Sequence, residues 1–228
     1  MISKRTIGDV LFEYLVLIAY LIFAFIFFIV MFSYVQEGRA NEKTDVDAKI
    51  VIVGGFTSTA EQMKFLEEKF PNSAVIILQK YAPLEEAEEV FLKQLEELGL
   101  KDEPVVFIAF CWGGLIVKKI SEDYPEKINI KKIITIATPS KGYSIAPRWV
   151  WRMLYGKMPA VKSKYPLFVI AGDKGEDRWF LNGSNDGTVE LDSVLSVEAD
   201  EIVLFPLSHL QLLHNEAVVE QIKLWVSN

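Results

Sequence analysis

One short segment constrains the fold more than any other, because it reads as a buried strand that turns at once into a helix. Residues 105–117, VVFIAFCWGGLIV, begin with a fully apolar run and continue with two glycines and helix-compatible residues. The pattern predicts a sharp turn with Cys111 at its apex. Ala109 and Gly113, two residues before and after the cysteine, are small, as a tight turn pressed against neighbouring backbone requires. A cysteine buried in a core strand is the alternative interpretation.

The rest of the chain from residue 49 alternates between strand-like and helix-like segments. Strands are predicted at 49–55, 74–78, 104–110, 130–137, 167–171 and 201–205, and helices at 58–70, 84–98, 112–122 and 215–226. Strands separated by helices of this length imply parallel crossovers, and hence an α/β fold with a mostly parallel sheet covered by helices on both faces. In such sheets the reacting groups gather at the carboxyl ends of the strands.

The N-terminal part of the chain has a different character. Residues 14–35, YLVLIAYLIFAFIFFIVMFSYV, carry no charge and are long enough as a helix to cross a hydrocarbon core of about 30 Å. They predict a transmembrane helix, preceded by a short basic tail at 1–13. A cleaved signal peptide is the alternative, but the apolar run is too long and no small-x-small cleavage site follows it. Residues 36–47 predict a polar linker, and 48–228 the α/β domain.

The side of the membrane on which the domain lies is only weakly indicated by charge. Lys4 and Arg5 before the span are balanced by Arg39 and Lys43 after it. The very short basic tail favours an N-terminus on the inside and therefore an extracytoplasmic domain.

A cysteine that attacks a carbonyl needs a base, because an unperturbed thiol has a pKa of about 8.5. The chain has two histidines, His209 and His214. His209 directly follows the strand predicted at 201–205, on the same sheet edge as Cys111, whereas His214 begins the final helix. Placement therefore favours His209 as the base.

The base in turn needs an acid that orients the imidazole and stabilises its charged form. Asp186 is favoured, since the segment 185–189, NDGTV, predicts a turn with a carboxylate at its exposed tip. Asp173 is the alternative acid, because it follows the strand at 167–171 more directly. Asp177 and Asp192 are further candidates in the same region.

Four segments in order resemble the α/β-hydrolase superfamily, in particular small lipase-like and esterase-like members with TPxxG and NDGTV segments. The resemblance covers the chain from about residue 49 to the end, and its segments are AFCWG at 109–113, TPSKG at 138–142, NDGTV at 185–189 and SH at 208–209. The first matches the Gly-x-Ser-x-Gly nucleophile elbow, and the chain order nucleophile, acid, histidine is that of the α/β-hydrolase fold.

The resemblance implies a role for each matching residue. Cys111 matches the nucleophile, Asp186 the acid and His209 the base, and the backbone N–H groups of Trp112 and Phe56 match the oxyanion-hole donors. The sequence departs from the pattern in having cysteine in place of serine. It also has two glycines, at 54 and 55, in place of the usual His-Gly before the first donor. Cysteine nucleophiles occur in this fold in dienelactone hydrolases, and no metal or organic cofactor is implied.

Residues 140–165 form a basic, aromatic segment without an acidic residue. Its basic residues are Lys141, Arg148, Arg152, Lys157, Lys162 and Lys164, and its large apolar ones include Tyr143, Trp149, Trp151, Met153, Leu154 and Tyr155. In a membrane-tethered chain this composition predicts a lid that lies on an anionic lipid surface. The alternative is a loop that packs its aromatic side chains against its own domain. The net charge of −7 argues against nucleic acid as a partner.

Together these patterns predict a single-pass, membrane-anchored acyl hydrolase with a Cys-His-Asp triad. Its substrate would be a small acyl ester, a thioester or a lipid ester. Two alternatives remain open. One is a catalytically silent hydrolase fold that serves as a membrane scaffold or binding protein, and the other is an acyltransferase that uses the same site.

Overall fold

A six-stranded parallel sheet forms the centre of the domain. The computed structural model describes residues 48–56, 58–78, 84–142, 149–150, 156–175 and 181–228, all within a compact unit, Val46–Asn228. The strands are β1 (Lys49–Val53), β2 (Ala74–Ile76), β3 (Val105–Phe110), β4 (Ile130–Ile136), β5 (Leu167–Gly172) and β6 (Glu201–Phe205). Their order is β2-β1-β3-β4-β5-β6, and each neighbouring pair runs parallel.

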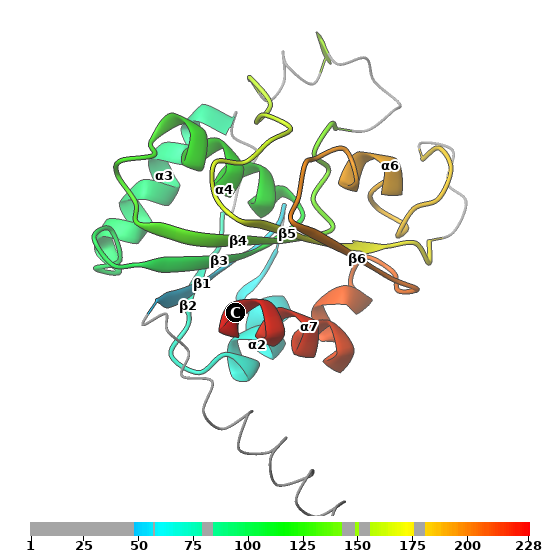
Figure 1. Ribbon diagram of the computed structural model, residues 1–228, viewed down its shortest axis with the longest axis horizontal. Helices are drawn as coiled ribbons and strands as arrows, with labels where there is room; N and C mark the ends of the chain where they lie inside the picture. The colour runs from blue at the N-terminus through cyan, green and yellow to red at the C-terminus, as the bar shows by residue number, and fades with distance from the viewer. Residues whose placement is uncertain (1–47, 57, 79–83, 143–148, 151–155, 176–180) are drawn as a thin grey trace, which may run out of the picture. The chain divides into compact units, whose positions relative to one another are not determined.

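Helices cover both faces of this sheet, with α3 and α4 on one face and α2 and α7 on the other (Figure 1). The helices are α2 (Ala60–Lys69), α3 (Leu84–Glu97), α4 (Trp112–Asp123), α6 (Leu191–Val194), the 3-10 helix η1 (Gln211–His214) and α7 (Glu216–Ser227). The predicted strands and long helices are therefore confirmed. The sequence pattern missed α6 and η1, because four residues are too few to show a helical period.

Helix starts follow local capping signals. The helix predicted from residue 58 begins two residues later because Thr59 is its N-cap. The Thr59 hydroxyl accepts the Gln62 N–H, and the Gln62 side chain accepts the Thr59 N–H in return. Asn215 is the N-cap of α7, and its side-chain oxygen accepts the Ala217 N–H at 2.9 Å.

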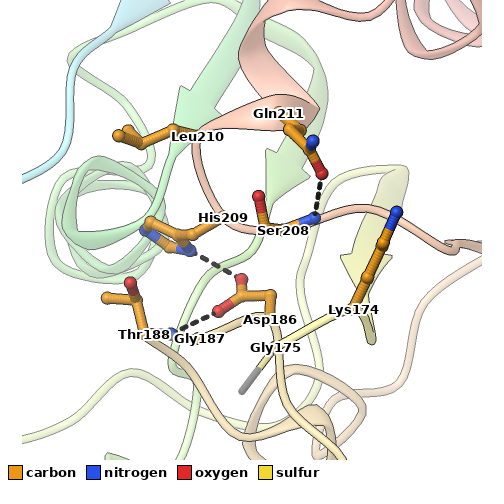
Figure 2. A pocket seen from close by; sticks show the side chains of 9 residues that line it. All are labelled: Lys174, Gly175, Asp186, Gly187, Thr188, Ser208, His209, Leu210 and Gln211. Atoms are coloured by element: carbon orange, nitrogen blue, oxygen red, sulfur yellow. Dashed lines mark hydrogen bonds and ion pairs between the residues drawn. The ribbon is translucent and has the colours of Figure 1, made fainter.

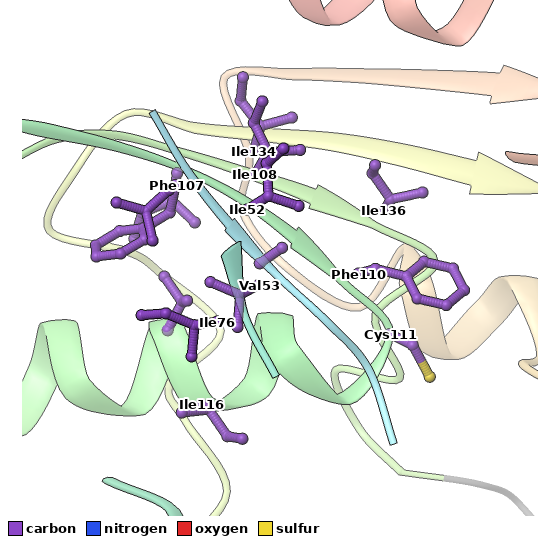
Figure 3. Packing of buried hydrophobic residues seen from close by; sticks show 14 of the residues in the cluster. Ile52, Val53, Ile76, Phe107, Ile108, Phe110, Cys111, Ile116, Ile134 and Ile136 are labelled. Atoms are coloured by element: carbon purple, nitrogen blue, oxygen red, sulfur yellow. The ribbon is translucent and has the colours of Figure 1, made fainter. Parts of the chain in front are cut away.

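The core is centred on β3, which is buried at every position along its length. Phe107 and Ile108 are wholly inaccessible to solvent, and Figure 3 shows them packed among side chains of the neighbouring strands and of α4. A strand with helices on both faces has no solvent side, which explains why its sequence is a continuous apolar run rather than an alternating one. This burial holds the strand, and therefore the residue that follows it, in a rigid frame.

The predicted transmembrane helix at 14–35, the basic tail at 1–13 and the linker at 36–47 lie outside the described residues. Among the residues that the structure describes, none belongs to a helix that combines the length and the apolarity needed to cross a membrane. The membrane anchor remains a prediction.

One buried charge in α4, that of Lys118, is only partly compensated by the described residues. Lys118 is 2% exposed, and its ammonium group has no hydrogen-bond partner among the described residues. Burial lowers the pKa of Lys118 to about 8, against a smaller opposing effect of the Glu122 carboxylate. The charged side chain therefore destabilises the folded state at neutral pH.

Replacing Lys118 with methionine is expected to raise the free energy of unfolding at pH 7 by up to about 3 kcal/mol, the cost that corresponds to this fall in pKa. The unfolded chain binds more protons than the folded one between pH 8 and the ordinary lysine pKa of 10.5, so wild-type stability rises over that range. The advantage of the variant should accordingly shrink as the pH rises. Urea unfolding at pH 7 and pH 10 measures the difference in the free energy of unfolding between Lys118→Met and the wild type. Lys93→Met, at a site on α3 whose side chain is 77% exposed, is the control, and equal stability of Lys118→Met and wild type at pH 7 would contradict the argument.

Candidate active site

The sheet topology brings the predicted site residues to one edge. The chain leaves β1 towards β2 and returns on the other side of β1 to form β3, so the strand order reverses between these two neighbours. Crevices form at such reversal points, outside the carboxyl ends of the strands. Cys111 directly follows β3, and Gly55 and Phe56 follow β1.

Cys111 is held in a strained backbone conformation, with φ of 50° and ψ of −119°. Residues other than glycine rarely adopt a positive φ, and they do so only where the surroundings enforce it. Here the Cys111 N–H donates to the Ile136 carbonyl at 2.8 Å, and the Cys111 carbonyl accepts the Gly114 N–H at 3.1 Å. The turn is thus tied to β4 on one side and to α4 on the other, which is the sharp elbow that the sequence predicts.

Neighbouring glycines allow the elbow to pack this tightly. A Cβ on Gly55 would lie 2.8 Å from the Cβ of Cys111, and a Cβ on Gly114 would lie 2.0 Å from the Thr138 hydroxyl oxygen. A Cβ on Gly113 would lie 2.6 Å from the carbonyl oxygen of Gly54. Real Cβ atoms are not found at such distances. The close approach of β1, the elbow and α4 is therefore possible only because these residues are glycines, which have no side chain.

Gly113→Ala is expected to lower the free energy of unfolding by about 3 kcal/mol, because its new methyl group meets backbone atoms that cannot swing away. Gly99→Ala is the matched control, since Gly99 has a φ of 68° but no atom lies within 4 Å of the position that its Cβ would take. The change at Gly99 would therefore cost only the strain of the left-handed backbone, about 1 kcal/mol. Chemical denaturation of both variants measures the difference, and equal losses would show that the contact with β1 is not tight.

His209 and Asp186 form a buried pair at the same sheet edge (Figure 2). The imidazole Nδ1 lies 2.6 Å from Asp186 Oδ2, and the backbone N–H of His209 donates to the Asp186 carbonyl at 2.8 Å. The other carboxylate oxygen, Oδ1, accepts the N–H groups of Thr188 at 2.9 Å and Val189 at 2.7 Å. Both carboxylate oxygens are therefore in use, and the imidazole is held in one orientation.

The turn at 185–189 gives the carboxylate its position. The Asn185 side-chain oxygen accepts the Gly187 N–H at 2.8 Å, and the Asn185 amide donates to the Gly183 carbonyl at 3.0 Å. Gly187 has a φ of 92°, a conformation that glycine adopts without a steric penalty. The NDG sequence thus folds into a tight turn that directs Asp186 inwards to the histidine rather than outwards to solvent.

The imidazole also contacts the elbow. Burial lowers the pKa of His209, but hydrogen bonds to Asp186 and Cys111, together with the negative charges of those two groups, outweigh burial and raise the pKa to about 10. The Phe110 ring lies against the imidazole, with 4.6 Å between the ring centroids. The side chain of His209 is thus bonded to a buried carboxylate, and it lies close enough to Cys111 for the cysteine to contribute to the raised pKa of the imidazole.

The resemblance implies that the backbone N–H groups of Trp112 and Phe56 form the oxyanion hole, and these residues follow β3 and β1. Trp112 is the first residue of α4, and Cys111 caps this helix without a side-chain hydrogen bond. The positive end of the helix dipole is therefore directed at the elbow, where it favours negative charge. Phe56 follows Gly55, whose backbone packs against the elbow.

The remaining candidates occupy other environments. Asp173 follows β5, as expected, but the carboxylate that bonds the imidazole is that of Asp186. His214 lies in η1, where its Nδ1 is 3.0 Å from the Leu210 carbonyl oxygen. Asp192 forms an ion pair with Lys141, and Asp177 lies outside the described residues.

A cavity of about 460 Å³ opens beside the His209–Asp186 pair. Its lining residues are Lys174, Gly175, Asp186, Gly187, Thr188, Ser208, His209, Leu210 and Gln211 (Figure 2). Sequence reasoning missed Lys174 and Gln211 as site residues. Their positions just after β5 and just after His209 are the signals that could have identified them. In the described part of the chain, no three His, Cys, Asp or Glu side chains cluster as metal ligands would.

The described ends of the basic segment 140–165 are attached to the domain. Lys141 pairs with Asp192, and the Ser193 hydroxyl donates to the Gly142 carbonyl at 2.5 Å, which ties the start of the segment to α6. Towards its other end, the Ala160 N–H donates to the Glu122 carboxylate of α4. Residues 143–148 and 151–155 lie outside the described residues, so the lid remains a prediction.

No protein-family model matches the sequence, and no curated protein matches it either. Solved structures do resemble the domain. The mature form of the Bacillus licheniformis lipase BlEst2 has a TM-score of 0.60 and 16% identity, over 80% of this chain and 93% of the lipase. The chain has an α/β-hydrolase fold.

Two further α/β-hydrolase structures have the same arrangement. The NocB thioesterase domain, in covalent complex with a fluorophosphonate nocardicin G analog, has a TM-score of 0.53 and 13% identity, over 80% of this chain and 96% of that domain. Mouse alpha/beta hydrolase domain-containing protein 10 has a TM-score of 0.52 and 14% identity, over 79% of this chain and 88% of that protein. At sequence identities this low, structural similarity shows only that the fold is shared. The chemistry must be argued from the residues of the site.

Proposed function

We propose that this α/β-hydrolase-fold protein is an acyl hydrolase that cleaves esters or thioesters with Cys111 as its nucleophile. The observation that carries the proposal is the imidazole of His209, which is bonded to the buried carboxylate of Asp186 and lies near Cys111, the residue at the apex of the strained elbow. A nucleophile, a base and an orienting acid in contact are the elements of a catalytic triad. Its lipase, esterase and thioesterase structural neighbours support the same class of reaction.

In the first half of the reaction, the Cys111 thiolate attacks the carbonyl carbon of the substrate. The resulting oxyanion would accept hydrogen bonds from the N–H groups of Trp112 and Phe56. As the intermediate collapses, the bond to the leaving alcohol or thiol breaks, and the leaving group takes a proton from the imidazolium of His209. The acyl group is then bound to Cys111 as a thioester.

In the second half, water hydrolyses this thioester. The now neutral imidazole of His209 removes a proton from the water molecule, and the resulting hydroxide attacks the acyl carbon. Collapse of the second intermediate releases the carboxylic acid and restores the thiolate–imidazolium pair. The Asp186 carboxylate stabilises the imidazolium in both halves and holds the ring in place.

The direct test uses the full chain, solubilised in a non-ionic detergent, with short and medium acyl p-nitrophenyl esters and with an acyl thioester. We expect turnover and, in rapidly quenched samples, a peptide that contains Cys111 and is heavier by one acyl group. A folded protein without turnover on any substrate, and without the acyl adduct, would favour the catalytically silent scaffold.

The acyltransferase alternative shares the acyl-enzyme and differs only in the acceptor. Product analysis with competing alcohols and amines separates the two. We expect free carboxylic acid to be the main product, because we propose water as the acceptor. An acyl ester or amide as the main product at millimolar acceptor would identify a transferase instead.

We also propose that the protein is anchored in a membrane by residues 14–35, with the domain on the extracytoplasmic side. The uncharged length of this segment supports the anchor, and the exposed Trp149, 66% accessible, supports a lipid-facing role for the basic segment 140–165. Cell fractionation combined with protease digestion of intact cells tests both statements. Recovery of the full chain in the soluble fraction would overturn the anchor, and protection from the protease would reverse the orientation.

A further inference from the structure

The cavity beside the His209–Asp186 pair is lined by hydrogen-bond donors. Lys174 contributes an ammonium group, and Ser208 contributes a hydroxyl group (Figure 2). The side-chain oxygen of Gln211 accepts the Ser208 N–H at 3.0 Å, so the amide nitrogen is the group of Gln211 that remains to donate to a ligand. The cavity is therefore suited to a ligand that accepts hydrogen bonds.

The described lining residues present a positive charge to the cavity. Among the described lining residues Asp186 is the one acidic residue. Its side chain is 0% exposed, and both carboxylate oxygens are bonded, one to His209 and the other to backbone N–H groups. Asp186 therefore presents no free negative charge to the cavity. Lys174 is exposed and forms no ion pair with another described residue.

The backbone of Lys174 is positioned by the two segments that carry the buried pair. Its N–H donates to the Leu207 carbonyl at 3.3 Å, next to the loop that holds His209, and it forms an isolated bridge with Asn185. The following residue, Gly175, lies so close to the acid turn that a Cβ would be 2.0 Å from the Asn185 side-chain oxygen. Lys174 therefore has a defined place relative to the reaction centre, unlike a lysine on a free surface loop.

We propose that this cavity binds an anionic group, a phosphate or carboxylate, on the alcohol or thiol part of the acyl substrate. The inference rests on the proposed function, because the cavity adjoins His209, the residue that gives its proton to the leaving group. Lys174, with Ser208 and Gln211, selects for that charge through charge-assisted hydrogen bonds. The phosphate could belong to a phosphorylated thiol such as coenzyme A or to a phospholipid headgroup, which share this chemistry.

A matched pair of substrates isolates the charge. The butyryl thioesters of 3-mercaptopropionate and of its methyl ester differ in one negative charge and share the acyl group. We expect Lys174→Gln to lower kcat/KM for the anionic thioester by about tenfold, the order of one charge-assisted hydrogen bond, and to leave the neutral one unchanged. Lys174→Arg should restore most of the loss, and Lys93→Gln, an exposed lysine on α3, should have no effect.

Butyryl-coenzyme A and dibutyryl glycerophosphate distinguish the two sources of phosphate. If Lys174→Gln lowers kcat/KM for one of these two substrates, the proposal is supported and that substrate identifies the source of the phosphate. No charge-dependent loss with any anionic substrate overturns it.

Binding of inorganic phosphate gives a readout that does not need turnover. The ring N–H of His209 should give a separate proton NMR signal, because the imidazole is buried and bonded to Asp186. We expect phosphate to shift this signal in the wild type, with affinity about tenfold weaker in Lys174→Gln. If phosphate binds but no substrate is turned over, the anion site is supported and the proposed function is ruled out. If substrates are turned over but the rate neither depends on Lys174 nor responds to phosphate, only the anion site is ruled out.

Discussion

Replacing Cys111 with alanine is expected to lower kcat/KM for ester and thioester hydrolysis by about 10⁵-fold while the protein stays folded. In the proposed mechanism the sulfur is the atom that forms the acyl-enzyme, and no other group of the site would take over its role. Alanine has the same preference against a positive φ as cysteine, so the strain of the elbow is unchanged. Steady-state kinetics measure the loss of kcat/KM. Intact mass after incubation with substrate shows whether an acyl-enzyme forms, and thermal unfolding followed by circular dichroism shows whether the variant is folded.

Cys111→Ser is the matched variant for this experiment. It keeps a nucleophilic atom but exchanges a thiol for a hydroxyl group, which stays protonated at neutral pH and needs His209 to act as a base at the moment of attack. We expect activity between those of the wild type and the alanine variant. Full activity of Cys111→Ala in a folded protein would show that the reaction does not pass through the sulfur.

Replacing Asp186 with asparagine is expected to lower kcat by about 10⁴-fold, because the imidazole loses both its orienting acceptor and its stabilising charge. The asparagine oxygen can still accept the N–H groups of Thr188 and Val189, so the turn should keep its shape. The amide nitrogen would then face Nδ1 of His209 as a donor and favour the wrong tautomer. Kinetics at a range of pH values measure the effect.

The pH profile separates this role from a structural one. The charge of Asp186 and its hydrogen bond are among the causes that raise the pKa of His209 to about 10. Without that charge the pKa of His209 falls, so the imidazolium is lost at lower pH, and the alkaline limb of the residual activity should move to lower pH. Asp173→Asn, the other acid considered from sequence, is the control and should be nearly fully active. A loss in Asp173→Asn without one in Asp186→Asn would contradict the assignment.

The acid of the site shows where sequence reasoning reached its limit. Chain order and turn chemistry favoured Asp186, yet Asp173 also follows a strand that ends at the same edge of the sheet. The distance of 2.6 Å between Asp186 and His209 joins segments that a sequence pattern treats separately. The hydrogen bonds that turn the carboxylate inwards are likewise made within a folded turn, so the residue types indicate the turn but not the direction of its side chain.

Patterns within single segments were sufficient to predict the parallel sheet, its covering helices and the strand-to-helix elbow at Cys111. Burial on both faces imposes continuous apolar runs, and a tight turn requires small residues at nearby positions, so each of these features is encoded locally. Only the tertiary structure decided the contact between His209 and Asp186, the donor-lined cavity with Lys174, and the burial of Lys118 without a hydrogen-bond partner among the described residues. Each of them depends on which distant segments pack together, because a side chain's hydrogen bonds, its exposure and hence its pKa are properties of its surroundings.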